Sequence, residues 1–72
     1  MDKNENPTNL ITKQFLMQHG IEVFGTKEKF NIWLERENFF FDKKAPIEFT
    51  NTDEGLKFIN DRLIGIEYGD NA

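Results

Sequence analysis

The side chains that could carry out acid–base or metal chemistry are scattered along this sequence. His19 is the only histidine and there is no cysteine, so the usual set of histidine and thiolate metal ligands cannot be assembled; we interpret it as a cation at a helix C-terminus or a solvated residue. The carboxylate pairs Asp53/Glu54 and Glu35/Glu37 suggest acid–base work, but acids at such spacings on a surface helix do not converge on one point. The sequence therefore predicts no catalytic residue, no metal site and no cofactor.

Length and charge narrow the classes of function. The chain has 72 residues, enough for one small domain and hardly for a deep substrate cavity, so an enzyme is disfavoured. It has 13 acidic and 9 basic residues, a net charge of −4 and no basic stripe, whereas direct nucleic-acid binding usually needs a clustered positive face. The N-terminus has no apolar run, so we expect neither a signal peptide nor a membrane span and place the protein in the cytoplasm.

Phenylalanine is abundant for so short a chain, with eight copies. The run Phe39, Phe40 and Phe41 cannot all be buried, because three consecutive side chains point in different directions in any regular backbone. We therefore expect at least one of them to face a partner chain or solvent.

The elements that must position these residues are helical. Residues 1–7 are polar and charged, and we expect a disordered tail there. From Thr8 to His19 a broad apolar stripe predicts an amphipathic helix. Gly20 either ends this helix after His19 or lies inside a longer helix that ends at Gly25. The sequence leaves both possibilities open.

The second predicted helix holds the only tryptophan. Thr26 is its expected N-cap and Asn38 its expected end. Phe30, Trp33 and Leu34 share one face at i, i+3 and i+4. Because an indole buries roughly 150–250 Å², we expect Trp33 to anchor the core.

The third predicted helix has the clearest start in the chain, where Thr52 is followed by Asp53 and Glu54. Apolar residues then recur every three or four positions and hold one face to the core. Before this helix, residues 39–45 are predicted to form a connecting loop. Residues 46–49 are predicted to form one short helical turn, because proline suits the first helical position.

Together these elements predict an all-α fold, a compact bundle of three to four short helices in a single domain. The domain is expected to span residues 8–69, with a C-terminal tail at residues 70–72. The predicted core consists of Phe24, Phe30, Trp33, Leu34, Leu56, Ile59 and Leu63.

Five short motifs follow one another along the chain: Val23-Phe24-Gly25, Trp33-Leu34, Ala45-Pro46-Ile47-Glu48-Phe49, Thr52-Asp53-Glu54-Gly55 and Ile66-Glu67-Tyr68-Gly69. Their order and spacing resemble the toxin-binding domain of Xre/MbcA/ParS-type antitoxins. The resemblance implies an all-helical domain that binds a RES-domain toxin, an enzyme that attacks NAD. It also implies that the antitoxin often dimerises and that its C-terminal end lies near the mouth of the toxin's active site.

By resemblance, then, this protein would be a homodimeric, non-catalytic antitoxin that occludes the active site of a RES-type toxin. The C-terminal end also has a purely structural interpretation, in which Tyr68 is a packing residue and Gly69 ends the helix. The resemblance favours the alternative, in which a flexible end presents an aromatic ring and two carboxylates to a pocket for an anionic dinucleotide. The predicted partner-binding residues are Glu67, Tyr68, Gly69, Asp70, Phe39, Phe40 and Phe41.

The chain also departs from the resemblance. Relatives usually have a small residue near Phe30 and glycines near Asp42 and Lys43. Many relatives carry a helix-turn-helix domain, and the residues before Val23 are too few for one, so we expect no direct nucleic-acid binding by this chain. The rival hypothesis is a homodimeric helical adaptor domain with an unrelated protein partner.

Overall fold

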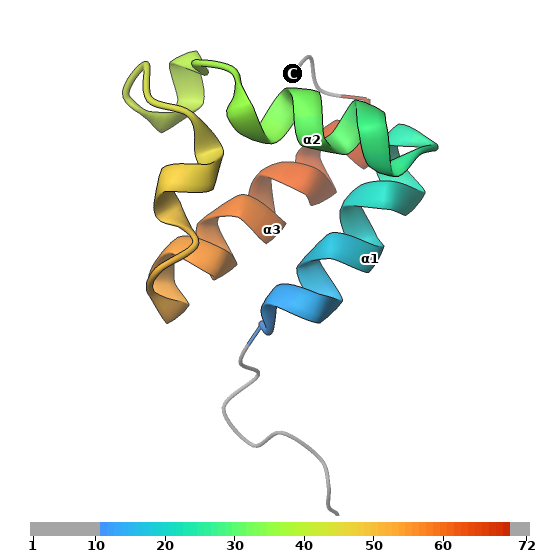
Figure 1. Ribbon diagram of the computed structural model, residues 1–72, viewed down its shortest axis with the longest axis horizontal. Helices are drawn as coiled ribbons and strands as arrows, with labels where there is room; N and C mark the ends of the chain where they lie inside the picture. The colour runs from blue at the N-terminus through green and yellow to red at the C-terminus, as the bar shows by residue number, and fades with distance from the viewer. Residues whose placement is uncertain (1–10, 70–72) are drawn as a thin grey trace, which may run out of the picture.

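The computed structural model describes residues 11–69, which form three α-helices and two 3₁₀ turns (Figure 1). In chain order these are α1 (Lys13–Phe24), α2 (Lys27–Glu35), η1 (Phe39–Phe41), η2 (Pro46–Phe49) and α3 (Asp53–Glu67). The predicted all-α class is confirmed, since this part of the chain holds no strand and a single isolated bridge between Asn38 and Lys44. The predicted tails, residues 1–7 and 70–72, lie outside the described residues.

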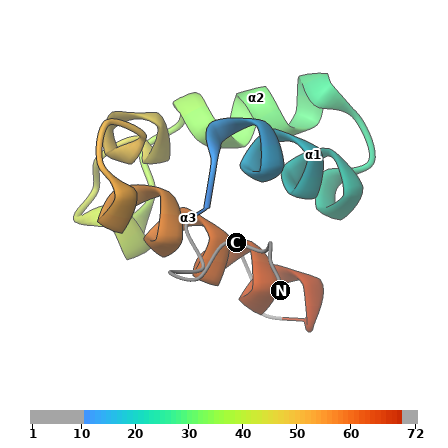
Figure 2. The same ribbon diagram turned by 90° about the horizontal axis from the view of Figure 1, so that it is seen from below.

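The three helices enclose the core together with η2. α1 contacts both α2 and α3, and η2 contacts the same two helices. Seen from below, α1 lies between α2 and α3, while both 3₁₀ turns lie at the end of the molecule where α3 begins (Figure 2). In this arrangement α3 and η2, from the second half of the chain, pack against α1 and α2 from the first half.

A threonine caps each α-helix. Thr12, Thr26 and Thr52 adopt extended backbone angles, and each hydroxyl accepts a hydrogen bond from the backbone N–H three residues ahead, at 3.0, 3.1 and 2.9 Å. These bonds satisfy N–H groups that have no partner within the helix. The caps at Thr26 and Thr52 were predicted, whereas α1 begins after Thr12 and not at Thr8.

Two glycines define the path of α1. The helix continues through Gly20 and ends at Gly25, which has φ of 94° and donates its N–H to the carbonyl of Ile21 at 2.7 Å. The longer of the two predicted helices is therefore correct. Gly20 must lack a side chain because a Cβ there would overlap the ring of Phe30.

Aromatic rings form the centre of the core. The buried cluster consists of Leu16, Phe30, Trp33, Leu34, Phe41, Leu56, Ile59 and Leu63. The ring of Trp33 has its centroid 5.6, 6.0 and 5.8 Å from those of Phe24, Phe30 and Phe41. Phe24 was predicted inside the core but is only partly buried, because it is the last residue of α1 and packs against the edge of the cluster.

The connection between α2 and α3 differs in part from the prediction. α2 ends at Glu35, before the expected Asn38, because Arg36 leaves the helical region with φ of −96° and ψ of 142°. Residues 39–45 were predicted as a loop, yet Phe39–Phe41 forms a 3₁₀ turn. The short helical turn at Pro46–Phe49 is confirmed.

Candidate partner-binding site

The C-terminal end of α3 presents an exposed aromatic side chain on a backbone held by hydrogen bonds. Tyr68 donates its N–H to the carbonyls three and four residues earlier, at 3.2 and 3.1 Å, and Gly69 donates to Ile66 at 3.0 Å. The Tyr68 side chain is nevertheless 84% exposed. The end expected to be flexible is thus ordered by hydrogen bonds as far as Gly69, whereas Asp70 lies outside the described residues.

Glu67 extends this end towards α1. Its Oε1 lies 3.1 Å from Nε2 of His19, whose Nδ1 lies 2.6 Å from Oδ1 of Asn60. The side chain of His19 is 13% exposed. The prediction that His19 is solvated or at a helix C-terminus is therefore wrong, because α1 continues past it and packs it against α3.

The environment of His19 favours its charged form. Partial burial of the ring disfavours the proton and is the largest single effect, but hydrogen bonds to Glu67 and Asn60 and the charges of Glu67 and Glu22 together outweigh it. The pKa of His19 is consequently raised above its ordinary value of 6.5. A carboxylate that accepts a hydrogen bond from this ring therefore favours its protonation.

The three phenylalanines of η1 have different surroundings. Phe39 is 79% exposed and Phe40 is half exposed, whereas Phe41 is 1% exposed. A 3₁₀ turn has three residues per turn, so its side chains spread evenly around the axis and one of them faces inward. The prediction that Phe41 contacts a partner is therefore corrected, since its ring packs against Phe49 and Phe58.

Asn38 builds the turn that presents Phe39 and Phe40. Its buried side chain accepts from the N–H of Phe40 at 2.9 Å, and its backbone N–H donates to the carbonyl of Lys44 at 3.1 Å. Asp42 and Lys43 then reverse the chain with φ of 58° and 64°. Glycine is the residue best suited to such angles, which fits the glycines that the resemblance places near these positions.

One flank of α3 continues the exposed aromatic surface of η1. The guanidinium of Arg62 lies 3.8 Å from the ring centroid of Phe40, and Phe58, one turn earlier, is half exposed. We call Phe39, Phe40, Phe58 and Arg62 the aromatic face. The sequence pattern places Phe58 off the core stripe, where it would either widen the apolar face or meet a partner, and it gives Arg62 no role, although their i, i+4 spacing was a usable signal.

Tyr68, at the C-terminal end of α3, lies apart from the aromatic face, whose Phe58 and Arg62 belong to the same helix. Tyr68 follows Arg62 by six residues, a rise of about 9 Å along the axis. The same spacing rotates the side chain about a third of a turn away. Among residues 11–69 no ring contact joins Tyr68 to Phe39 or Phe40. A partner that contacts both must therefore reach at least from Arg62 to Tyr68, about 9 Å along the axis and around the helix.

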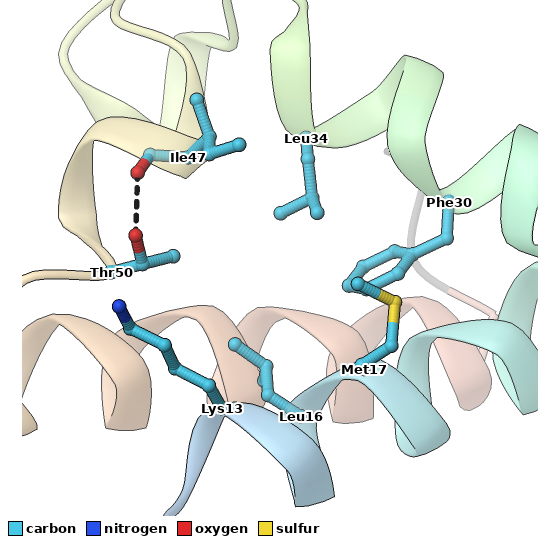
Figure 3. Close-up of a pocket in the computed structure, with 7 residues that line it drawn as sticks. All are labelled: Lys13, Leu16, Met17, Phe30, Leu34, Ile47 and Thr50. Carbon is cyan, nitrogen blue, oxygen red and sulfur yellow. Dashed lines mark hydrogen bonds between the residues drawn. The ribbon is translucent and has the colours of Figure 1, made fainter.

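An apolar groove lies between α1, α2 and η2 (Figure 3). Its volume is about 180 Å³, and its lining residues are Lys13, Leu16, Met17, Phe30, Leu34, Ile47 and Thr50. The hydroxyl of Thr50 donates to the carbonyl of Ile47 at 2.9 Å, as the dashed line in Figure 3 shows. This volume is below the range of about 300–1,000 Å³ typical of small-molecule sites. The groove is small, is lined mainly by apolar side chains and offers no acid–base pair. It therefore suits an apolar side chain better than a substrate.

The described residues bring no metal-binding or membrane-spanning feature to these surfaces. No three His, Asp or Glu side chains in residues 11–69 are grouped so that they could hold a metal ion. None of α1, α2 and α3 is both long enough and apolar enough to cross a membrane.

The fold and its exposed surfaces define a small helical interaction domain. The family model of the antitoxin Xre/MbcA/ParS C-terminal toxin-binding domain matches residues 19–69. Because this match covers more than half of the chain, the chain belongs to that family, as the motifs indicated. Its partner is accordingly a toxin protein, and toxin binding is the property that defines the family. Comparisons with curated proteins and with solved structures gave no match.

Proposed function

We propose that this domain neutralises a RES-type, NAD-degrading toxin by placing the end of α3 across the mouth of the toxin's active site. The observation that carries the proposal is the exposed ring of Tyr68 on a hydrogen-bonded backbone. A tyrosine held in this way gives a large contact area and loses little conformational entropy on binding. Tyr68 and Glu67 both lie within the segment that matches the toxin-binding family.

Charge supports this assignment. A pocket that receives an anionic dinucleotide presents positive potential, and the chain carries a net charge of −4. Opposite potentials speed the encounter of two proteins and favour the correct partner. Glu67 would then take a position where the toxin stabilises negative charge, so inhibition needs no reaction by the antitoxin.

The aromatic face supplies the second contact of the proposed complex. Phe39 and Phe40 are exposed, and Arg62 lies over one of their rings. Aromatic and arginine side chains are enriched among the residues that dominate binding energy at interfaces. In this proposal Phe39 and Phe40 pack on the rim of the toxin while Tyr68 enters the active-site mouth.

Coexpression with a RES-type toxin tests the proposal. The pair should copurify, and the wild-type domain should abolish NAD hydrolysis. Tyr68→Ala should weaken inhibition by roughly 30-fold or more, the effect of losing about 2 kcal/mol at a dominant contact. Ile32→Ala is the matched control, because Ile32 is also an exposed apolar residue, 56% exposed, but lies on α2. Equal inhibition by both variants would contradict the assigned contact.

A homodimeric adaptor with another partner is the second candidate function. The aromatic face favours it, because exposed aromatic side chains beside an arginine also suit contact between two copies of a chain. Because the resemblance implies a dimer for the antitoxin as well, protection of cells from the toxin distinguishes the candidates, and sedimentation equilibrium tests the dimer that the adaptor requires. The adaptor requires a dimer that Phe40→Ala dissociates, together with no protection of cells from the toxin, whereas the antitoxin must protect them.

A further inference from the structure

His19 joins the two helices that support the proposed binding end. Its ring lies on α1, and both of its nitrogens face oxygen atoms of α3. Nδ1 is 2.6 Å from Oδ1 of Asn60, and Nε2 is 3.1 Å from Oε1 of Glu67. A carboxylate oxygen and an amide oxygen both accept hydrogen bonds. A neutral imidazole has one N–H and can satisfy only one of them, whereas an imidazolium has two.

The charges around the ring are consistent with a cation. Glu22 on α1 and Glu67 on α3 are the charged groups that act on His19 within the described residues. Phe15, also on α1, lies beside the ring with its centroid at 6.0 Å. Both charges are negative, so they favour protonation from the two elements that pack around the ring.

We propose that His19 is a positioning residue for toxin recognition: as a doubly donating imidazolium it ties the last turn of α3 to α1 and holds Glu67 in a fixed orientation beside Tyr68. The role in recognition rests on the proposed function, whereas the protonated bridge stands on the geometry of the free domain. Neither the sequence pattern nor the family match assigns a role to His19.

Deprotonation breaks the bridge. The neutral ring keeps one N–H, so either Asn60 or Glu67 loses its donor. The pKa of His19 is raised in the folded chain, so the stabilisation is complete below the unfolded value of about 6.5 and is lost as pH rises through the folded value. The last turn of α3 therefore becomes less tightly held as pH rises through the folded pKa of His19, and toxin binding weakens with it.

The free domain provides the first test, because a single histidine gives one unambiguous set of imidazole signals in ¹⁵N NMR. At neutral pH the wild-type ring should show two protonated nitrogens, and its pKa should lie above the ordinary value. Glu67→Gln should lower that pKa by removing the charged acceptor. Asp61→Asn is the matched control, since Asp61 is an exposed carboxylate on α3 that pairs with Lys57 and should leave the pKa nearly unchanged.

Two outcomes would overturn the bridge. A neutral ring protonated only at Nε2 would mean that the amide of Asn60 presents its N–H₂ group to Nδ1, with no cation required. Equal pKa changes in Glu67→Gln and Asp61→Asn would mean that a general loss of negative charge, and not the contact, sets the titration.

The complex provides the second test. Inhibition of the toxin should weaken by roughly threefold or more as pH rises through the titration of His19, whose position the NMR experiment gives. His19→Gln cannot titrate, so its inhibition should keep only the pH dependence that the toxin itself contributes. Identical pH profiles for the two proteins would leave His19 with a purely structural role. Failure of both to bind the toxin would overturn the proposed function, while the NMR titration still decides the bridge.

Discussion

The ring of Phe30 lies directly against the backbone of Gly20, and this contact sets the approach of α2 to α1. The ring is fully buried and stacks with Trp33 at a centroid distance of 6.0 Å. A bulky residue is accommodated on α2 because the facing helix has no side chain at that point. The family resemblance leads one to expect a small residue near Phe30, so in this chain the small residue stands on the other helix.

Adding one methyl group at Gly20 should therefore destabilise the domain. Gly20→Ala places a Cβ inside the volume of the Phe30 ring, and overpacking of this kind costs about 1–3 kcal/mol. Urea unfolding followed by tryptophan fluorescence measures the loss. Gln18→Ala, an exposed change on the same helix, should stay within about 0.5 kcal/mol. A gain of about 1 kcal/mol for Gly20→Ala, as helix propensity alone implies, would contradict the contact.

Trp33 contributes through its ring and not through its indole nitrogen. Its Nε1 is buried and has no hydrogen-bond partner among the described residues, and burying such a donor costs about 1–3 kcal/mol. Trp33→Ala should lose about 3–5 kcal/mol. Trp33→Phe keeps a stacking ring and removes the unpaired donor, so it should lose clearly less. Differential scanning calorimetry measures the loss of stability in each variant. Equal losses in Trp33→Ala and Trp33→Phe would mean that Nε1 has a hydrogen-bond partner.

Phe41 and Phe39 are chemically identical residues two positions apart with opposite roles. Phe41→Ala empties a fully buried site and should cost about 3–5 kcal/mol. Phe39→Ala removes an exposed ring and should change stability by less than about 0.5 kcal/mol. Phe39→Ala should instead weaken toxin inhibition. Thermal unfolding together with an inhibition assay separates the two, and a large loss of stability in Phe39→Ala would count against the exposed position.

Lys43 occupies a strained position in the turn after η1. Its φ is 64°, where a side chain with a Cβ costs roughly 1–2 kcal/mol and glycine does not. Lys43→Gly also makes the unfolded chain more flexible, at a cost of about 0.4–1 kcal/mol. We therefore expect a net stabilisation of about 0.5–1 kcal/mol, measured by chemical denaturation. Lys44→Gly lacks this benefit and should destabilise, so the reverse order of the two would refute the assigned strain.

Local signals in the sequence located the starts of α2 and α3 but misplaced the start of α1 and the end of α2. Thr26 and Thr52 were predicted as caps because a hydroxyl followed by a helical pattern is a local feature. Thr8 and Thr12 both fit that pattern, and the apolar stripe did not distinguish them. The identical side chains of η1 could not be ranked either, because which one turns inward depends on the hydrogen bonds that Asn38 makes.

The sequence identified the family, but not the contacts that surround the end of α3. His19 is separated from Asn60 by 41 positions and from Glu67 by 48, so no periodicity along the chain relates them. The apolar groove was missed for the same reason, because its lining comes from three different elements. Packing between distant segments creates both features, and a one-dimensional pattern does not contain that information.

The segment that defines the family begins at His19, halfway along α1. A truncated form of this domain, made for expression or for fusion to another protein, should begin before Thr12. A cut at the edge of the matched segment would remove the hydroxyl that starts the helix and the buried Leu16. The ring of Phe30 would then become partly exposed, because Leu16 belongs to the same buried cluster. The first turn of the shortened fragment would fray instead of packing against the core.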